Sequence, residues 1–184
     1  MPVLDQLFQG LSYAGSFGLI WLALAFGLSG LSIRRPWLLA RVAVTILAAE
    51  LVSGLLKLWI GRDRPPLATP DPEPLVHLPP TGSLPSGHAT VAFACATALA
   101  LPLPRLAVPL YVLAALIAFS RVYTGVHYPL DILAGAALGL VVGLAVAQGG
   151  RLLRHVGGRA DSRATAPRTP RAGPPRSRRR RRAG

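Results

Sequence analysis

Residues 120–131 read SRVYTGVHYPLD and lie at the junction of two strongly apolar segments, 105–119 and 129–147. Charged side chains are costly at such a junction in a membrane protein and usually mark a functional site. His127 and Asp131 are four residues apart, so a helix beginning near Tyr128 would bring the carboxylate within hydrogen-bonding reach of the imidazole. Two interpretations are open from this stretch alone: a catalytic histidine oriented by a carboxylate, and a pair that only caps a helix.

The composition of the chain is typical of a polytopic membrane protein. Of its 184 residues, 52% are hydrophobic and 15% are charged, and the mean hydropathy is +0.46, which is too apolar for a soluble domain of this size. The net charge of +13 is concentrated in residues 151–184, which carry twelve arginines and one acid. Residues 1–150 hold eight basic and six acidic residues and are nearly neutral.

Five apolar segments predict an all-α bundle of about five transmembrane helices, at residues 13–31, 37–60, 87–101, 105–119 and 129–147. The third segment is short for a hydrocarbon core of about 30 Å, so it either gains turns at its ends or is a core helix packed among the others. A cleavable signal peptide ending near Ala25 is the alternative for the first segment, but no basic region precedes that segment.

Small residues recur every fourth position in two of these segments. They are Gly135, Gly139 and Gly143 in the fifth segment, and Ala92, Ala96 and Ala100 in the third. Because small-xxx-small rows let helices approach closely, the two helices are predicted to pack along these rows. The rows extend towards Asp131 and His88, so this packing would bring His88 close to the His127–Asp131 pair.

The remaining segments are predicted to lack regular structure. Residues 61–85 contain eight prolines, which prevent a continuous helix through most of this loop. Residues 151–184 consist largely of Arg, Pro, Gly, Ser and Ala and cannot bury a core. The sequence therefore predicts a transmembrane domain at 1–150 and a disordered basic tail at 151–184.

The arginines predict the orientation of the chain in the membrane. With five spans, Arg34, Arg35, Arg105 and the tail fall on one side, which the positive-inside rule makes cytoplasmic. The long loop 61–85 and the stretch 120–131 then face outward. We expect the tail to bind anionic lipid headgroups, with nucleic acid as the less favoured partner.

Three segments meet at the predicted outer face and together suit a phosphate dianion. They supply the cations Lys57, Arg64 and Arg121, the helix start Ser86–Gly87, the histidines His88 and His127, and the carboxylate Asp131. Arginine and lysine side chains neutralise phosphate oxygens, and backbone N–H groups at a helix start add donors aligned with the helix dipole. The side-chain set indicates a phosphate-binding site.

Two histidines at one phosphate can divide the work of phosphoryl transfer. His127, oriented by Asp131, fits the nucleophile, and His88 fits the acid that protonates the leaving oxygen and the base that later activates water. No acidic cluster for a divalent metal is evident, so we expect a reaction with no metal and no cofactor. Cys95 is the single cysteine, which excludes an intramolecular disulfide and a cysteine metal cluster.

These segments resemble the signature of the membrane-bound type 2 phosphatidic acid phosphatase family, which shares its site with vanadium-dependent haloperoxidases. The chain has Lys57 followed after six residues by Arg64-Pro65, then Pro85-Ser86-Gly87-His88, then Ser120-Arg121 with His127 and Asp131. The resemblance implies a phosphohistidine at His127, His88 as acid and base, and phosphate held by Lys57, Arg64, Ser86, Gly87 and Arg121. It covers roughly residues 50–135.

The expected function is a lipid phosphatase acting on a membrane-anchored phosphomonoester or diphosphate. The candidate substrates are a polyprenyl diphosphate, phosphatidic acid and phosphatidylglycerol phosphate. A vanadate-dependent haloperoxidase and a non-catalytic membrane scaffold are the alternatives. Outside the signature, Glu50 is expected to face the bundle interior, and His77 and His155 to be ordinary exposed residues. Arg62 and Asp63 are expected to be solvated loop residues, with binding of lipid headgroups as the less favoured alternative.

Overall fold

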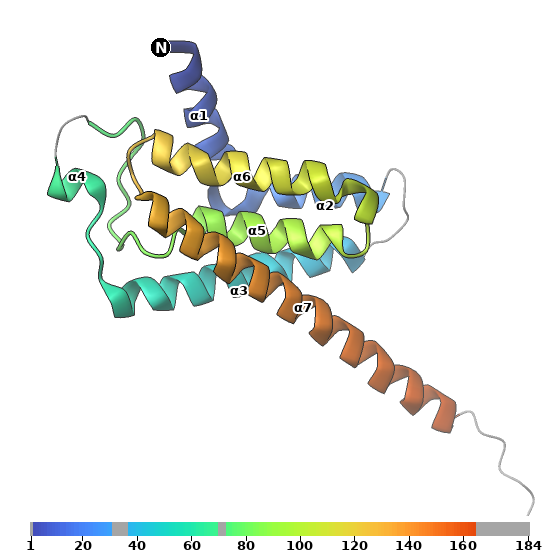
Figure 1. Ribbon diagram of the computed structural model, residues 1–184. Helices are drawn as coiled ribbons and strands as arrows, with labels where there is room; N and C mark the ends of the chain where they lie inside the picture. The colour runs from blue at the N-terminus through green and yellow to red at the C-terminus, as the bar shows by residue number, and fades with distance from the viewer. Residues whose placement is uncertain (1, 31–36, 70–72, 165–184) are drawn as a thin grey trace, which may run out of the picture. The chain divides into compact units, whose positions relative to one another are not determined.

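The computed structural model describes residues 2–30, 37–69 and 73–164, and every regular element within these ranges is helical (Figure 1). The elements are α1 (Pro2–Ala14), the 3₁₀ turn η1 (Ser16–Gly18), α2 (Leu19–Gly30), α3 (Trp37–Ile60), α4 (Pro65–Ala68), α5 (Gly87–Ala100), the 3₁₀ turn η2 (Pro104–Leu106), α6 (Ala107–Tyr123) and α7 (Pro129–Ala164). The predicted all-α membrane bundle is confirmed. Residues up to Arg151 form one compact unit.

Helix α5 is the central element of this unit. Eleven of its fourteen residues are buried, and it packs against both α3 and α6 (Figure 1). Most of its side chains are Ala or Thr, so neighbouring helices approach it closely on several sides. The short third segment was expected either to gain turns at its ends or to be a core helix. In the structure it is a core helix of 14 residues.

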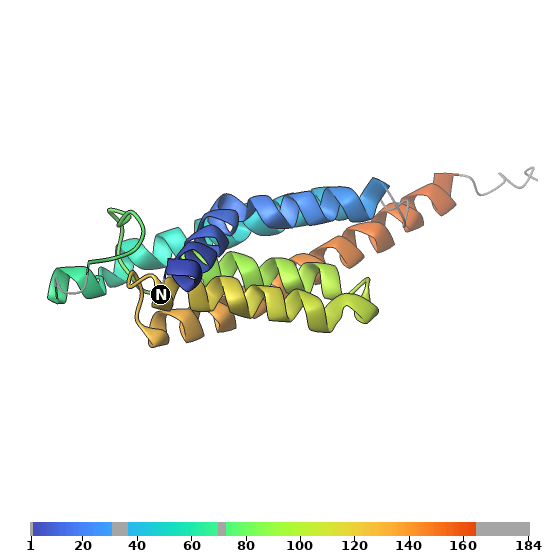
Figure 2. The same cartoon turned by 90° about the horizontal axis from the view of Figure 1, so that it is seen from above.

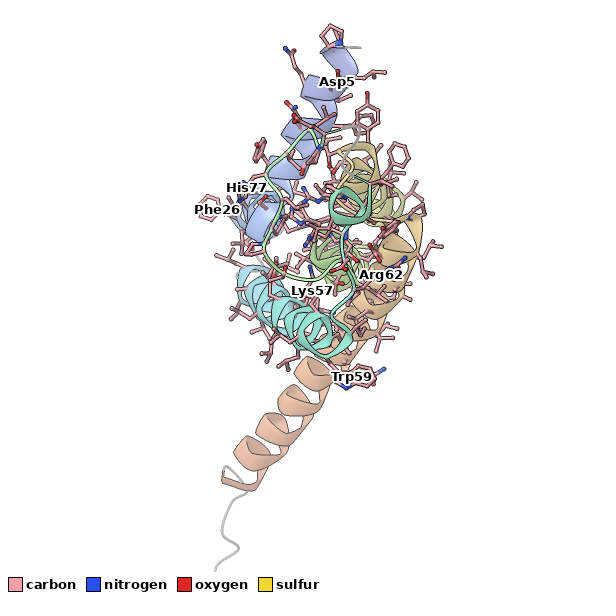
Figure 3. All side chains as sticks on the ribbon, turned by 90° about the vertical axis from the view of Figure 1, so that its left-hand side faces the viewer. Asp5, Phe26, Lys57, Trp59, Arg62 and His77 are labelled. Atoms are coloured by element: carbon pink, nitrogen blue, oxygen red, sulfur yellow. The ribbon has the colours of Figure 1, made fainter. Side chains whose placement is uncertain are left out.

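The other long helices carry the surface that meets lipid. Within the described ranges, three helical stretches are long and apolar enough to cross a bilayer, at Trp37–Ala68, Pro104–Tyr123 and Pro129–Gly150. Helices α1 and α2 together form a bent pair that passes the same test. Phe26 and Trp59 are 71% and 83% exposed and point away from the bundle (Figure 3). Exposed apolar side chains of this kind suit a helix surface that faces lipid.

The first predicted span differs from the structure. We expected one helix over residues 13–31, but the chain bends by 69° between α1 and α2 (Figure 2). Gly18 has a φ of +69°, and a Cβ at that position would lie 2.7 Å from the Ile46 side chain. A glycine is therefore needed both for the backbone conformation and for close packing on α3. Helix α1 begins at Pro2, eleven residues before the predicted span.

The glycine row of α7 packs directly on α5, as predicted. A Cβ at Gly135 would lie 2.6 Å from the Ser86 carbonyl oxygen, and one at Gly143 would lie 2.7 Å from the Ala94 carbonyl oxygen. Real side chains do not fit at such distances, so only glycine allows this approach. The start of α7 is thereby held against the start of α5.

The predicted partner row on α5 was wrong. The glycines of α7 lie against Ser86, Thr90 and Ala94, and their nearest neighbours do not include Ala92, Ala96 or Ala100. Residues 90 and 92 are about 200° apart around a helix, so the two rows lie on different faces. The spacing was correct, but small residues cover most of α5 and did not distinguish its faces.

Helix α7 also extends further than predicted. We expected disorder from Arg151 onward, but the helix continues to Ala164. Residues 151–164 contain no proline, so nothing removes a backbone donor, and an existing helix is extended at lower cost than a new one is started. The rest of the predicted tail, with the arginines at 34 and 35 and Asp71, lies outside the described residues.

Candidate active site

The three predicted segments meet at one end of the bundle. The end of α3, the start of α5, the end of α6 and the start of α7 lie together there (Figure 1). Lys57, near the end of α3, points inward between the helices, and Arg62 and His77 lie on the surrounding loop (Figure 3). Short connections at 101–106 and 124–128 make α5, α6 and α7 antiparallel neighbours. The long loop 61–86 returns the chain from the end of α3 to the start of α5 at the same end of the bundle.

His127 lies in the tight turn between α6 and α7. Gly125 has a φ of +77° and lets the chain reverse, and the His127 N–H donates to the Arg121 carbonyl at 3.2 Å. His127 is 3% exposed, and its Nδ1 is 3.3 Å from Asp131 Oδ2. The same carboxylate oxygen accepts from the Tyr128 N–H at 2.9 Å. Asp131 therefore caps α7 and also faces the His127 ring, while the catalytic role of the pair stays a prediction.

Asp131 has a further partner that we did not expect. Arg62 Nη1 donates to Asp131 Oδ1 at 2.9 Å, and the Arg62 guanidinium lies 4.3 Å from the Tyr128 ring centroid. The interpretation of Arg62 as a solvated loop residue was wrong. The charge on Asp131, which is fully buried, is thus balanced by a cation from a segment 69 residues away.

Arg64 fixes the tautomer of His127. Its Nη1 donates to the Val126 carbonyl at 3.0 Å and lies 3.1 Å from His127 Nε2. Arginine has no acceptor, so this contact requires a lone pair on Nε2 and places the ring proton on Nδ1, facing Asp131. Arg64 itself is held by the Thr81 and Gly82 carbonyls at 2.8 and 3.2 Å. His127 Nε2, which faces Arg64, therefore carries the lone pair.

The ionisation of His127 agrees with a nucleophilic role. Burial lowers the pKa of His127 to about 4, and the Asp131 carboxylate opposes only part of this shift. Neighbouring cations, Arg64 and Lys57 among them, lower it further. The imidazole is therefore neutral at pH 7, and its Nε2 lone pair faces the Arg64 guanidinium.

The start of α5 brings His88 to the same site. Ser86 is the N-cap of α5, and its hydroxyl accepts from the Ala89 N–H at 3.4 Å. The Ser86 N–H donates to the Asp131 carbonyl at 3.0 Å, which joins α5 to α7 directly beneath the site. His88 Nε2 lies 3.2 Å from the Ser12 carbonyl oxygen and 3.3 Å from Ser16 Oγ. Helix α1 thus contacts the second predicted catalytic histidine.

A cavity of about 460 Å³ lies among these side chains. Six of the eight predicted site residues line it, namely Lys57, Arg64, Gly87, His88, Arg121 and His127. The other two, Ser86 and Asp131, are fully buried and support the lining residues. The cavity is also lined by residues that were not predicted to belong to the site: Ser12, Tyr13, Ser16, Glu50, Ser53, Gly54, Val76, His77, Pro79 and Thr81.

Arg121 presents a donor that lacks a partner. The residue is 4% exposed, and its Nη1 donates to Ser12 Oγ. Its Nε is buried, and no described residue accepts a hydrogen bond from it. A buried, unpaired donor on a cation is costly unless a ligand satisfies it. An anion in the cavity would supply that acceptor.

Two further predictions concern residues at the edge of the site. Glu50 lines the cavity beside Gly87. A Cβ on Gly87 would lie 3.9 Å from Glu50 Oε2. His77 is exposed, as expected, and it also lines the cavity. Among the residues that the structure describes, no group of three His, Cys, Asp or Glu side chains could hold a metal ion.

Comparison with known proteins shows which family the chain resembles. A family model described as the PAP2 superfamily matches residues 38–153. The matched range contains all three segments that carry the predicted site. The chain is also similar to the decaprenylphosphoryl-5-phosphoribose phosphatase of Mycobacterium tuberculosis, with 37% identity over 145 residues that cover 75% of this chain and 76% of that protein.

Two solved structures share the helical framework. The transmembrane PAP2-type phosphatidylglycerolphosphate phosphatase of Bacillus subtilis has a TM-score of 0.64 at 31% identity, covering 82% of this chain and 78% of that chain. LpxE of Aquifex aeolicus has a TM-score of 0.70 at 30% identity, covering 80% and 87% of the two chains. The likeness thus extends beyond the three segments to the arrangement of the helices that position them.

Proposed function

The chain belongs to the PAP2 superfamily and is an integral-membrane lipid phosphatase, and we propose that it works through a phosphohistidine at His127. The observation that carries this mechanism is the state of the His127 ring. Its Nδ1 faces Asp131 at 3.3 Å, and its Nε2 carries a lone pair beside Arg64 at the cavity. A neutral nucleophile next to phosphate-binding cations is the arrangement that in-line attack on a phosphomonoester needs.

In the first step His127 Nε2 attacks phosphorus, a P–N bond forms, and the P–O bond to the lipid breaks. His88 takes the proton of the bound phosphate monoanion and gives it to the leaving oxygen, so the lipid departs as an alcohol or, from a diphosphate, as a lipid phosphate. In the second step neutral His88 takes a proton from water, the water oxygen bonds to phosphorus, and the P–N bond breaks. The electron pair returns to Nε2, and inorganic phosphate leaves.

The cations stabilise the charge that develops on phosphorus during both steps. Arg64 and Arg121 are nearly fully buried, and Lys57 lines the same cavity, so their charges act where water screens them little. We assign these three side chains to the phosphate oxygens, together with the backbone at Gly87. Ser86 acts from below, because its hydroxyl already caps α5. Three cations supply this stabilisation without a metal ion, so metal-free turnover is part of the proposal.

The substrate is a phosphate presented by a membrane lipid. The relatives described above are named for a phosphoribose and a phosphatidylglycerolphosphate, each carried on a lipid. The cavity lies at the ends of helices whose outer faces carry exposed apolar side chains, so a lipid headgroup can enter while its chains stay in the bilayer. We therefore propose a lipid phosphomonoester, with a polyprenyl diphosphate as the second substrate to test.

Phosphate release from a panel of lipid substrates tests this function. The purified full chain is assayed with phosphatidic acid, phosphatidylglycerol phosphate, a polyprenyl phosphosugar phosphate and a polyprenyl diphosphate, with and without chelator. His127→Ala and His88→Ala should lose activity, while His155→Ala, the same change on α7 outside the compact unit, should match the parent. No release from any substrate would reject the function, and loss in chelator reversed by Mg²⁺ would reject the metal-free mechanism.

We also propose that the site opens to the outer side of the membrane and that the tail is cytoplasmic. Arg105 lies in η2, at the opposite end of the bundle from the cavity, which is the end that the positive-inside rule assigns to the cytoplasm. A membrane-impermeant maleimide on intact cells should label Glu73→Cys and leave Arg105→Cys unlabelled. Cys95 is buried and gives little background. Labelling of Arg105→Cys alone would reverse the orientation.

The arginine-rich tail is proposed to bind anionic lipid headgroups. Residues 165–184 follow a transmembrane helix, and Arg clusters in that position are attracted to the anionic cytoplasmic leaflet by about 1 kcal/mol per charge. A fluorophore at the C-terminus of the full chain should report contact with anionic nanodiscs and none with zwitterionic ones. Displacement by low concentrations of double-stranded DNA would favour nucleic acid instead.

A further inference from the structure

Helix α1 lies outside the range matched by the family model, which begins at residue 38. Its last turn nevertheless contacts two of the side chains to which we assign chemistry. Ser12 is 1% exposed and lies against the cavity, and Ser16 lines the cavity from η1. These contacts make the beginning of the chain part of the site.

The first contact orients His88. A carbonyl oxygen only accepts, so the 3.2 Å contact between His88 Nε2 and the Ser12 carbonyl places a ring proton on Nε2. Ser16 Oγ lies 3.3 Å from the same nitrogen and donates its own proton to the Ser12 carbonyl at 3.1 Å. A Cβ at Gly15 would lie 3.4 Å from His88 Cδ2, so this whole edge of the ring faces α1 and η1. Nδ1, on the opposite edge, is left to take up and release the catalytic proton.

The second contact orients Arg121. Its Nη1 donates to the Ser12 hydroxyl, while its buried Nε has no acceptor among the described residues. One side of the guanidinium is therefore held by protein, and the other keeps a donor for an anion. Fixing a guanidinium in advance lowers the entropy lost when it binds phosphate.

The position of α1 is itself fixed by contacts along its length. The Tyr123 hydroxyl donates to Asp5 Oδ1 at 2.8 Å, and the Phe8 ring lies 4.3 Å from the Tyr123 ring and 5.5 Å from the Phe119 ring, centroid to centroid. Gln9 Nε2 donates to the Leu75 carbonyl at 2.9 Å. These contacts tie α1 to α6 and to the long loop, so Ser12 meets the site from a supported helix.

We infer that Ser12 and Ser16 are positioning residues of the phosphatase site. Ser12 holds the Arg121 guanidinium for the substrate phosphate, and Ser16, with the Ser12 carbonyl, holds the His88 ring with Nδ1 towards the leaving oxygen. The inference rests on the proposed function for its kinetic consequences, but the effect of Ser12 on anion binding does not depend on turnover. The two hydroxyls act through different residues, so their loss has different kinetic signatures.

Loss of the Ser12 hydroxyl weakens phosphate binding. We expect Ser12→Ala to raise KM and the dissociation constant of orthovanadate or inorganic phosphate about tenfold, the usual scale for a lost hydrogen bond to a charged group. Ser12→Thr, which keeps the hydroxyl, recovers most of the affinity. Anion affinity equal to that of the parent in Ser12→Ala overturns the inference, and so does tighter binding, since it would mean that Ser12 competes with phosphate for Arg121.

Loss of the Ser16 hydroxyl affects protonation of the leaving group. We expect Ser16→Ala to lower kcat/KM about tenfold for an alkyl phosphate, whose leaving oxygen needs the His88 proton, and to leave it unchanged for an aryl phosphate. The matched control is Ser29→Ala on α2, where a hydroxyl makes the same bond to the carbonyl four residues earlier, from Ser29 to Ala25 at 2.6 Å. An equal loss with both substrates, or no loss with either, overturns this half of the inference.

Two measurements separate failure of the inference from failure of the proposed function. Vanadate affinity of the full chain in detergent is measured by calorimetry, and the unfolding temperature of each variant is compared with that of Ser29→Ala. If the parent releases phosphate from no lipid but Ser12→Ala still weakens vanadate binding, the function falls and the assignment of Ser12 stands. If the parent is active and Ser12→Ala binds vanadate as well as the parent does, the function stands and the assignment falls.

Discussion

The two histidines of the site are oriented by different kinds of partner. His127 Nδ1 faces the Asp131 carboxylate, four residues away on the helix that His127 precedes. His88 Nε2 faces the Ser12 carbonyl and the Ser16 hydroxyl, which belong to an N-terminal segment more than 70 residues away. A carboxylate stabilises the positive charge that forms on a phosphorylated imidazole, whereas neutral oxygens leave a protonated imidazole free to give up its proton. The partners therefore suit a nucleophile and an acid, respectively.

Removing each histidine is the strongest way to break this comparison. We expect His127→Ala to lower kcat about ten-thousandfold with every substrate, because the attacking imidazole is removed. His88→Ala should cost about a hundredfold to ten-thousandfold with lipid substrates, and much less in the first step with an aryl phosphate, whose leaving oxygen needs no proton. Initial bursts of the aryl product in stopped-flow experiments measure that first step.

The two variants must differ in this burst if the roles are assigned correctly. His88→Ala should form the phosphoenzyme and hydrolyse it slowly, so that the burst persists while turnover stops. His155→Ala serves as the matched histidine control. A burst in His127→Ala together with none in His88→Ala would exchange the two roles.

Loss of the carboxylate partner is the next largest effect. Asp131→Asn should lower kcat about a hundredfold to ten-thousandfold, because an amide neither fixes the Nδ1–H tautomer nor stabilises the phosphorylated ring. The change also removes the 2.9 Å ion pair with Arg62, so the protein should unfold at lower temperature. Asp63→Asn, on an exposed carboxylate of the adjoining loop, is the control and should match the parent. Equal activity of Asp131→Asn and the parent would leave the carboxylate with a capping role alone.

The comparison also explains which parts of the site were predictable. The His127–Asp131 pair could be found because its members are close in sequence and their spacing is that of one helical turn. We could predict that Lys57, Arg64 and Arg121 lie together because successive apolar spans end on alternate sides of the membrane. Each of these inferences needs only local spacing or the order of the spans.

The supports that were missed come from distant segments with ordinary residue types. A serine in an apolar helix gives no signal that it meets an arginine 109 residues later, as Ser12 meets Arg121. Arg62 likewise looked like a loop cation, because its pairing with Asp131 depends on how the loop folds over α7. Gly15 and Gly18, inside the first apolar run, were the one available hint that the chain bends there and returns to the site.

The pH dependence sharpens the assignment of the nucleophile. The pKa of His127 is lowered to about 4, mainly by burial, and the neutral form is the one that attacks. The rate therefore rises as pH increases through about 4 and is lost below it, by about tenfold per pH unit. The measurement is the acid limb of kcat/KM, corrected for titration of the substrate phosphate and repeated in His155→Ala. An apparent pKa of the acid limb near the ordinary histidine value, in both the parent and His155→Ala, would mean that the nucleophile is not buried as described.

The smallest effect concerns the distance between the two histidines. Gly135→Ala would place a Cβ 2.6 Å from the Ser86 carbonyl oxygen and push the start of α7 away from the start of α5. We expect destabilisation of about 1–3 kcal/mol and a severalfold lower kcat with little change in fold. Gly149→Ala on the same helix meets nothing within 4 Å and should be neutral or slightly stabilising, as measured by thermal unfolding in detergent. Equal unfolding temperatures for the two variants would argue against close packing of α7 on α5.

The central claim is that phosphate passes through a covalent bond to His127 Nε2. Its most direct test is rapid quenching of the full chain during turnover of a lipid phosphate, followed by mass spectrometry of the peptide that contains residues 120–131 under conditions that preserve phosphohistidine. The account predicts phosphate on His127 in the parent, more of it in His88→Ala, and none in His127→Ala. Phosphate on His88, or turnover that continues in His127→Ala without any labelled histidine, would contradict it.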